Sequence, residues 1–339
     1  MRFTPHRQYS TIDRMNHKAS LSTPSSLALP ISSTALGSAR ERGGQWLMIA
    51  GGVLLGTIGV FVEEAGQHPL VTVWFRCVFG ALALVAWCLA TGRGRELLLR
   101  NQARSRWVAC ATGVFMVLNW ALFFAAIPRT SIAVATVIFH VQPIWVIVFG
   151  ALFLREAVSV SQWIATLVAL GGLVLTTGLL DGIPAGTADG GAYVAGVLMC
   201  LGGSLCYAAV TLLASRTRQA DQADQPISPF ALSLWQCMVG AVLLVWAPFV
   251  FGGPQTAGAW AWLTGLGVLH TGLAYVILFA GMARLALGKV AVLQFVYPLT
   301  AVLVDWAVYG RTLSPVQLAG VALMAAALWT IRRPAKAAS

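Results

Sequence analysis

Two ionisable side chains, Arg76 and Asp305, lie within long apolar stretches of the sequence, and Glu63 and Glu64 end the first such stretch. A guanidinium can bind a substrate carboxylate through two parallel hydrogen bonds. Asp305 or Glu64 would then bind an amine or carry protons. The structural alternative is an ion pair of Arg76 with Glu63 or Glu64, or an Arg76 side chain that snorkels to the membrane surface. The sequence is compatible with both roles.

Two histidines lie near the middle of apolar stretches, where an unpaired polar group is costly. His140 comes shortly before Pro143, with Gln142 between them, and His270 occupies a later stretch. Imidazole titrates near neutral pH, so either histidine could bind substrate or carry a proton in a central cavity. A hydrogen bond between helices is the alternative for each of them.

Other polar and aromatic side chains in these stretches suit the wall of a cavity that holds an amphiphilic solute. We assign this role to Asn119, Trp120, Tyr275, Gln294 and Tyr297. Ordinary helix packing is the alternative. Pro143 and Pro298 fall near the centres of their stretches, where proline frees a backbone carbonyl and bends a helix. They are either hinges or packing kinks.

No catalytic or cofactor motif accompanies these residues. The sequence has no GxSxG, no HExxH and no glycine-rich loop ending in GK[ST]. The six cysteines form no CxxC pair, which argues against a zinc site or a disulfide framework. They are interpreted as small buried apolar residues: Cys77, Cys88, Cys110, Cys200, Cys206 and Cys237. We therefore expect no metal, no cofactor and no enzymatic activity.

The elements that must position these residues are apolar helices. Of the 339 residues, 58% are hydrophobic and only 10% are charged, whereas a soluble chain carries about 25% charged residues. Ten stretches are long enough to cross a bilayer as helices. They are 46–62, 70–90, 107–127, 131–154, 161–180, 191–214, 230–251, 259–282, 287–309 and 314–331. Strands of a membrane barrel would be half as long and would alternate in polarity. We predict an all-α membrane protein with ten transmembrane helices.

The formal net charge of +11 indicates orientation. With a cytoplasmic N-terminus, 19 of the 22 lysines and arginines fall in the cytoplasmic tails and connectors, and only Arg129 and Arg311 fall on the opposite side. This asymmetry follows the positive-inside rule. It predicts both termini in the cytoplasm and a multi-pass protein of the bacterial inner membrane. Because the basic residues follow the connectors, nucleic acid is not an expected partner.

The ten stretches form two sets of five. At an offset of 155, residues 119–171 align without gaps on 274–326. The matched pairs at this offset include Trp120 with Tyr275, Pro143 with Pro298, Ser159 with Ser314 and Gln162 with Gln317. At an offset of 160, Arg76 aligns with Gln236 and Gly80 aligns with Gly240. Because five is odd, the second set runs through the membrane upside down relative to the first. Inverted repeats can rock about a shared central site, which favours a transporter over a channel.

Two five-helix repeats, 44–180 and 181–333, are thus expected between two cytoplasmic tails, 1–43 and 334–339. Residues 1–43 are rich in Ser, Thr, Arg and Pro and show no sustained periodicity, so we expect them to be disordered. Their longest apolar run is too short for a secretory signal. Met15 is an alternative start site.

The fourth and fifth stretches contain a run of small residues, a mid-helix proline, a Glu near the cytoplasmic end, and then a Gln and a Gly in the next helix. These last four residues are Pro143, Glu156, Gln162 and Gly171. The pattern resembles the EamA type of the drug/metabolite transporter superfamily. The second copy keeps Pro298, Gln317 and Gly320 but has Arg311 where the Glu is expected.

The resemblance covers about residues 46–331. It implies a secondary transporter that exports or exchanges small organic metabolites, often amino acids, through a cavity between the two halves. The implied partners are a small-molecule substrate and the lipid bilayer, with protons and a homodimer left open. The alternative is a membrane-embedded enzyme or an accessory membrane protein without transport activity. The shared motifs are typical of helix packing and capping and carry no information on the substrate.

Overall fold

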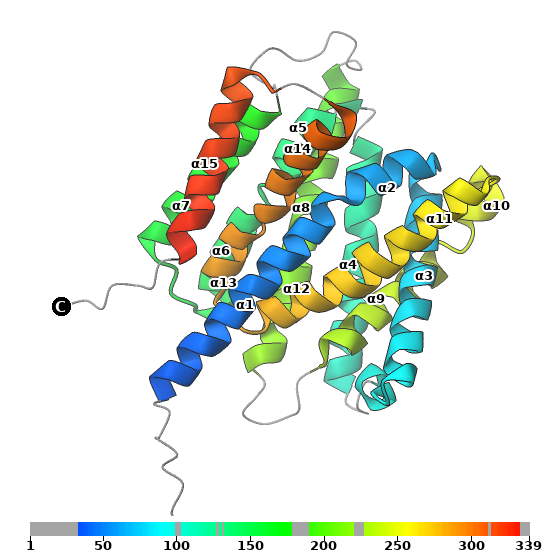
Figure 1. Cartoon of the computed structure of the whole chain (residues 1–339), viewed down its shortest axis with the longest axis horizontal. Coiled ribbons are helices and arrows are strands. Elements are labelled where there is room, and N and C mark those ends of the chain that lie inside the picture. The colour runs from blue at the N-terminus through cyan, green and yellow to red at the C-terminus, as the bar shows by residue number, and fades with distance from the viewer. Residues whose placement is uncertain are drawn as a thin grey trace, which may run out of the picture.

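The computed structural model describes residues 33–98, 103–126, 129–130, 132–177, 190–219, 227–310 and 313–332. Within these ranges the regular elements are all helices, without a strand (Figure 1). They are α1 (Ser33–Gly56), α2 (Ile58–Ala65), α3 (Pro69–Ala90), η1 (Gly94–Leu97), α4 (Ala103–Ala126), α5 (Ile132–Phe139), α6 (Gln142–Leu154), α7 (Val160–Thr176), α8 (Gly190–Gln219), α9 (Pro229–Leu243), α10 (Ala247–Phe251), α11 (Ala257–Gly265), the π-helical η5 (Leu266–Leu273), α12 (Ala274–Met282), α13 (Leu287–Leu293), α14 (Val296–Tyr309) and α15 (Pro315–Arg332).

Seven segments of the described chain are long and apolar enough to cross a membrane, and each covers one predicted stretch. They are Gly37–Ala65, Pro69–Ala90, Arg106–Ala126, Val134–Leu154, Gly190–Ser215, Ala257–Met282 and Leu287–Tyr309. The other three predicted stretches hold shorter apolar helices, Val160–Thr176, Pro229–Leu243 and Pro315–Thr330. The prediction of an all-α membrane protein is confirmed, and the count of ten spans stays a prediction.

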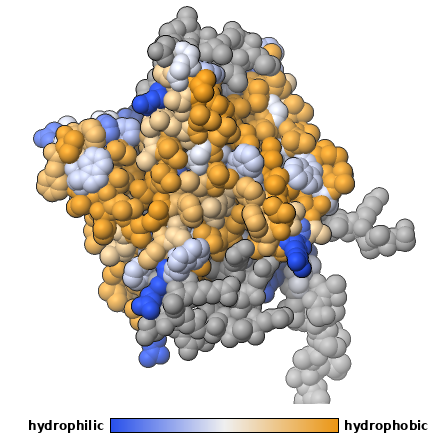
Figure 2. Space-filling model, turned by 180° about the vertical axis from the view of Figure 1, so that it is seen from behind, coloured by the Kyte–Doolittle hydropathy of each residue, from blue (hydrophilic) through white to orange (hydrophobic). Residues whose placement is uncertain are grey.

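The outer surface is apolar, as contact with lipid requires. Figure 2 shows hydrophobic residues over most of one face, with the few strongly hydrophilic residues near its upper and lower edges. Large side chains point outward, among them Phe249, which is 85% exposed, and Val242, which is 69% exposed. Soluble monomers rarely expose apolar surface on this scale. The chain is therefore a multi-pass membrane protein.

The first helix begins earlier than the sequence predicts. We expect disorder over residues 1–43, but α1 begins at Ser33, which corrects that boundary; residues 1–32 lie outside the described part. Glu41 gives a physical reason. Its carboxylate pairs with Lys289 at the start of α13 and accepts a hydrogen bond from Gln45 one turn further along α1. These contacts hold the early turns of the helix against the second half of the chain.

Residues that match in the repeat cap their helices in the same way. Ser159 and Gln162 begin α7, and Ser314 and Gln317 begin α15. In each pair the Ser hydroxyl accepts from the Gln backbone N–H, at 3.3 and 3.2 Å, and the Gln Oε1 accepts from the Ser backbone N–H, at 3.0 and 2.9 Å. This reciprocal capping box satisfies two backbone donors at once.

The two matching prolines coincide with matching breaks. Two residues separate α5 from α6, and two separate α13 from α14. Pro143 lies in the first turn of α6, and Pro298 lies in the first turn of α14. Because proline has no N–H, the carbonyls of Phe139 and Gln294 lose their usual helical donor. Both helices are therefore interrupted at equivalent points.

Equivalent helices of the two sets make equivalent contacts with each other. α4 packs along α8, and α12, which matches part of α4, packs along α1, which matches α8. Likewise α3 packs against η5, and its counterpart α9 packs against α4. The last helices of the two sets, α7 and α15, lie side by side (Figure 1).

Close approach of α3 and α9 depends on two matching glycines. A Cβ on Gly240 would lie 2.5 Å from Cys77 Sγ, and a Cβ on Gly80 would lie 3.2 Å from Cys237 Sγ. Cys77 and Cys237 are themselves repeat mates at the offset of 160. The crossing of α3 and α9 is thus nearly symmetric, and larger residues at either glycine would separate the helices.

A second close approach joins α7 to α15. Gly320 packs against the carbonyl of Gly172, where a Cβ would lie 2.5 Å from the carbonyl oxygen, and Gln317 Nε2 donates to the Thr176 carbonyl at 3.2 Å. Gly171, which the resemblance singles out, faces open space instead. The packing glycine of this helix is its neighbour, Gly172.

Candidate functional site

Arg76 lies on α3 and is buried, with only 3% of the residue exposed. Its Nε donates a hydrogen bond to Thr271 Oγ1 at 3.0 Å, and its Cζ lies 4.3 Å from the centroid of the Trp120 ring. Glu63 and Glu64 are exposed near the end of α2, and within the described residues neither pairs with Arg76. The surface ion pair and the snorkelling side chain are therefore both wrong.

A small cavity of about 10 Å³ lies beside Arg76, which is room for about one water molecule. Its lining side chains come from α4, α9, η5 and α12: Trp120, Ser233, Gln236, Cys237, Thr271 and Tyr275. Arg76 contacts three of these, Thr271, Trp120 and Tyr275. The cavity therefore lies where the second and third helices of one set meet their counterparts from the other.

Several polar atoms around this cavity are buried without a hydrogen-bond partner in the described part of the chain. They are Arg76 Nη2, Ser233 Oγ and Gln236 Nε2. An unsatisfied buried donor costs about 1–3 kcal/mol, and more when it is charged. No acidic side chain lines the cavity. The arrangement is thus one positive charge with neutral donors beside it.

The cavity brings repeat mates together. Trp120 and Tyr275, matched at the offset of 155, have ring centroids 6.4 Å apart at an interplanar angle of 62°. Gln236, the mate of Arg76, lines the same cavity. The position of Arg76 is occupied by a charge in the first half and by a neutral amide in the second.

His270 lies close by in the π-helical η5 but serves a different contact. It is fully buried, and its Nε2 lies 2.7 Å from Thr57 Oγ1, with the ring edge against Phe61 at a centroid distance of 4.5 Å. It does not line the cavity, contrary to the prediction. A hydrogen bond between helices, the alternative, describes it. The π-helix itself often marks a functional segment, and here it carries Thr271 to Arg76.

A second polar cluster surrounds the break between α5 and α6. His140 Nδ1 lies 2.7 Å from the Thr136 carbonyl, and its ring stacks on Tyr297 at a centroid distance of 5.8 Å and lies 6.2 Å from Phe295. Gln142, on the first turn of α6, is 2% exposed. The two interrupted helices therefore meet through aromatic contacts at His140.

Three other predicted site residues make their contacts elsewhere. Asn119 donates from Nδ2 to the Gly203 carbonyl at 2.9 Å, so it joins α4 to α8 instead of lining the cavity. Asp305 is half-buried on α14, which packs along α1. Gln294, predicted with them, donates to Thr211 Oγ1 at 3.3 Å, near the second helix break.

Glu156 links the two halves at the surface. Its Oε2 accepts a hydrogen bond from the backbone N–H of Leu287, the first residue of α13, at 2.9 Å. A carboxylate is stabilised there by the positive end of the helix dipole. Arg311, at the position that corresponds to the Glu in the second copy, lies outside the described residues.

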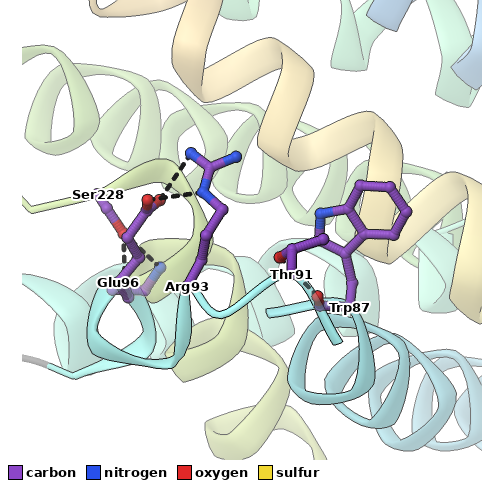
Figure 3. Close-up of polar contacts among 6 residues, drawn as sticks. Trp87, Thr91, Arg93, Glu96 and Ser228 are labelled. Carbon is purple, nitrogen blue, oxygen red and sulfur yellow. Dashed lines mark hydrogen bonds and ion pairs between the residues drawn. The ribbon is translucent and has the colours of Figure 1, made fainter. Parts of the chain in front are cut away.

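A polar junction ties the connector after α3 to the start of α9. Figure 3 shows Arg93 bonded twice to the carboxylate of Glu96, at 2.7 and 3.1 Å, and Ser228, the N-cap of α9, donating to the Glu96 carbonyl. The carboxylate of Glu96 raises the pKa of Arg93 above its ordinary value because it hydrogen-bonds the charged form. This arginine therefore has an acidic partner, which Arg76 lacks among the described residues.

The sequence did not identify four of the lining residues, and three of these, Ser233, Cys237 and Thr271, had no distinguishing feature. Small polar residues in apolar helices are common and usually bond their own backbone, so none of the three gave a signal. Gln236 could have been found, because the offset of 160 aligns it with Arg76. In the described part of the chain, no group of three or more His, Cys, Asp or Glu residues could hold a metal ion.

The model of the EamA-like transporter family matches residues 42–178 and 194–333. Similar curated proteins all carry the name uncharacterized transporter. YxxF of Bacillus subtilis is 26% identical over 86% of this chain and 90% of its own. A protein of Archaeoglobus fulgidus is 29% identical over 84% and 94%. YwfM of Bacillus subtilis is 31% identical over 81% and 88%.

A solved structure, described only as the crystal structure of a protein, has a similar fold. It superposes with a TM-score of 0.71 at 18% sequence identity and covers 85% of this chain and 97% of its own. At that identity the likeness concerns the fold alone.

Proposed function

The chain belongs to the EamA-like transporter family, and from this premise we propose that it is a secondary transporter of small organic metabolites that works by alternating access. It exports or exchanges its substrate across the inner membrane of a bacterium. In this proposal ten helices cross the membrane as two inverted sets of five, with both termini in the cytoplasm. The transporter names of its relatives favour transport over a membrane-embedded enzyme.

The observation that carries the proposal is the composition of the cavity wall. Trp120 and Gln236 come from different halves, and their repeat mates Tyr275 and Arg76 complete the same site. A site built from both halves changes its accessibility when one half rotates against the other. A channel would need a continuous pore, whereas the side chains here surround a small cavity of about 10 Å³.

The interrupted helices supply the moving parts. Pro143 and Pro298 each free a carbonyl at the break, so bending there loses fewer hydrogen bonds than bending elsewhere. Gly80 and Gly240 let α3 and α9 slide past each other at short distance. Rocking of the two halves would therefore turn about the α3–α9 crossing while α6 and α14 adjust.

Counterflow in proteoliposomes tests transport. Liposomes that contain the purified chain are preloaded with one compound from a panel of organic acids, amino acids and amines, and uptake of the labelled form is followed. We expect saturable exchange for at least one class of compound. Exchange no faster than in protein-free liposomes for the whole panel would refute the proposal.

Repeating the assay with an imposed pH gradient identifies the driving force. Uptake that needs the gradient and is lost in Asp305→Asn would support proton coupling through that carboxylate. Uptake that is independent of the gradient and requires substrate on both sides would support exchange.

A further inference from the structure

We propose that the site at the cavity beside Arg76, which holds about one water in this conformation, widens during transport and binds the carboxylate of an organic substrate with a net charge of −1, in preference to a zwitterionic amino acid or an amine. This inference rests on the proposed function, because it names the class of substrate that the transporter carries. It concerns the cavity formed by Trp120, Ser233, Gln236, Cys237, Thr271 and Tyr275 together with Arg76.

The first argument is charge balance. Arg76 is 97% buried in a membrane protein, yet its described partners are all neutral: the Thr271 hydroxyl, the Trp120 ring and the Tyr275 phenol. A buried charge is strongly destabilising unless it is paired. The lining residues include no acidic side chain. A bound monoanion would balance the charge, and a neutral or cationic solute would not.

The second argument is the set of free donors. Arg76 Nη2, Gln236 Nε2 and Ser233 Oγ are all buried and unpaired within the described residues. A carboxylate offers two oxygens with about four acceptor sites, so it can accept from the guanidinium and from the neutral donors together. A phosphate dianion would leave a negative charge unbalanced, because the site carries only one cation.

The third argument concerns selectivity. An amino acid would bring an ammonium group into a site whose lining has no carboxylate to accept it. Desolvating an unpaired charge is costly, so such a site discriminates strongly against the extra group. Trp120 and Tyr275 offer aromatic surface to the rest of the molecule. The favoured substrate is therefore a carboxylate with an apolar body.

The binding experiment uses the purified full-length chain in detergent and isothermal titration calorimetry. The probes are phenylacetate, phenylalanine, 2-phenylethylamine and inorganic phosphate. Phenylacetate should bind saturably, and the other three should bind about tenfold more weakly or not at all. Phenylalanine or the amine binding as tightly as phenylacetate would overturn the inference, and so would phosphate as the tightest ligand.

Arg76→Gln should weaken phenylacetate binding about 100-fold, the size expected when one partner of a buried charge pair is removed. Arg93→Gln is the matched control, because that arginine lies in the connector after α3 and pairs with Glu96 (Figure 3). It should leave binding unchanged. Unaltered affinity in Arg76→Gln that elutes as a folded species on gel filtration would overturn the inference.

An exchange of repeat mates tests the symmetry of the site. The double variant Arg76→Gln/Gln236→Arg moves the cation across the pseudo-twofold axis and should recover most of the lost affinity. If the Arg76 variants fail to fold, Ser233→Ala and Gln236→Leu serve instead, each with about tenfold weaker phenylacetate binding expected. Unchanged affinity in both of these would overturn the inference.

Counterflow separates this inference from the proposed function. Phenylacetate that binds in an Arg76-dependent manner but never crosses the membrane would refute transport and leave the binding site intact. Flux of phenylalanine that is unaffected by Arg76→Gln would leave transport intact and refute the carboxylate site.

Discussion

The cavity beside Arg76 and the helix crossing at His140 are both polar clusters inside an apolar protein, but they are satisfied differently. At the cavity, three buried polar atoms have no hydrogen-bond partner among the described residues, and one of them belongs to the charged guanidinium of Arg76. At the crossing, His140 bonds a carbonyl of its own helix and stacks between aromatic rings from α14 and its preceding residues. The first cluster suits an external anion, whereas the second holds two interrupted helices together.

The largest expected difference in transport is between a substitution at the cavity and a substitution at the His140 cluster. Arg76→Gln should lower kcat/KM for carboxylate counterflow about 100-fold. His140→Phe installs the residue found at its repeat mate, Phe295, and should stay within about threefold of the wild type, since stacking is retained. Parallel counterflow assays measure both. A loss in His140→Phe as large as that in Arg76→Gln would erase the distinction between the clusters.

Substitution of Pro143 and Pro298 tests whether the interrupted helices at the His140 cluster move during transport. Pro143→Ala and Pro298→Ala restore a backbone donor and straighten the helices, so turnover should fall about tenfold while the Kd for phenylacetate is unchanged. Steady-state exchange gives turnover, and calorimetry gives Kd. A weakened Kd with normal turnover would assign the prolines to binding instead.

Removing one aromatic ring from each cluster should produce a smaller difference in carboxylate affinity. Trp120→Ala removes the ring beside the Arg76 guanidinium and should weaken carboxylate binding about fivefold, within the range of a desolvated cation–π contact plus lost packing. Tyr297→Ala, at the crossing, should change binding less than twofold. Calorimetric titrations measure the affinity of both variants. A larger loss in Tyr297→Ala than in Trp120→Ala would contradict binding at the cavity.

The smallest effect concerns stability without substrate. Arg76→Met replaces an unpaired buried charge by an apolar side chain and should raise the Tm of the unliganded protein by a few degrees. Phenylacetate should raise the Tm of the wild type and leave that of Arg76→Met unchanged. Thermal unfolding in detergent measures both shifts. A lower Tm in the variant would indicate that Arg76 is already compensated in the free protein.

Hydrophobic length and the repeat offsets predicted much of this molecule. Apolar stretches predicted where helices lie, and the offset of 155 paired Trp120 with Tyr275, whose ring centroids lie 6.4 Å apart in the structure. The early turns of α1 were missed because one of the contacts that hold them, the ion pair of Glu41 with Lys289, comes from far along the chain. No local pattern reports a partner so distant.

The sequence predicted how far along a helix each side chain lies better than it predicted which neighbouring helix the side chain faces. Asn119 and Trp120 are neighbours, but consecutive residues point about 100° apart around a helix. One therefore meets α8 and the other meets Arg76. The same ambiguity concealed Ser233 and Thr271, whose importance comes from which helix they face.

The near symmetry of the α3–α9 crossing bears on how such a protein could arise. Two identical five-helix subunits, inserted in opposite orientations, would also pack a glycine of each against a cysteine of the other, as Gly240 lies on Cys77 and Gly80 near Cys237, but every position on the axis would then be duplicated. Such a dimer would hold either two guanidinium groups facing each other across a few ångströms or none. In a single chain the two repeats can differ, so Arg76 can occupy a position whose repeat mate is the neutral Gln236, and the site then carries one charge instead of two.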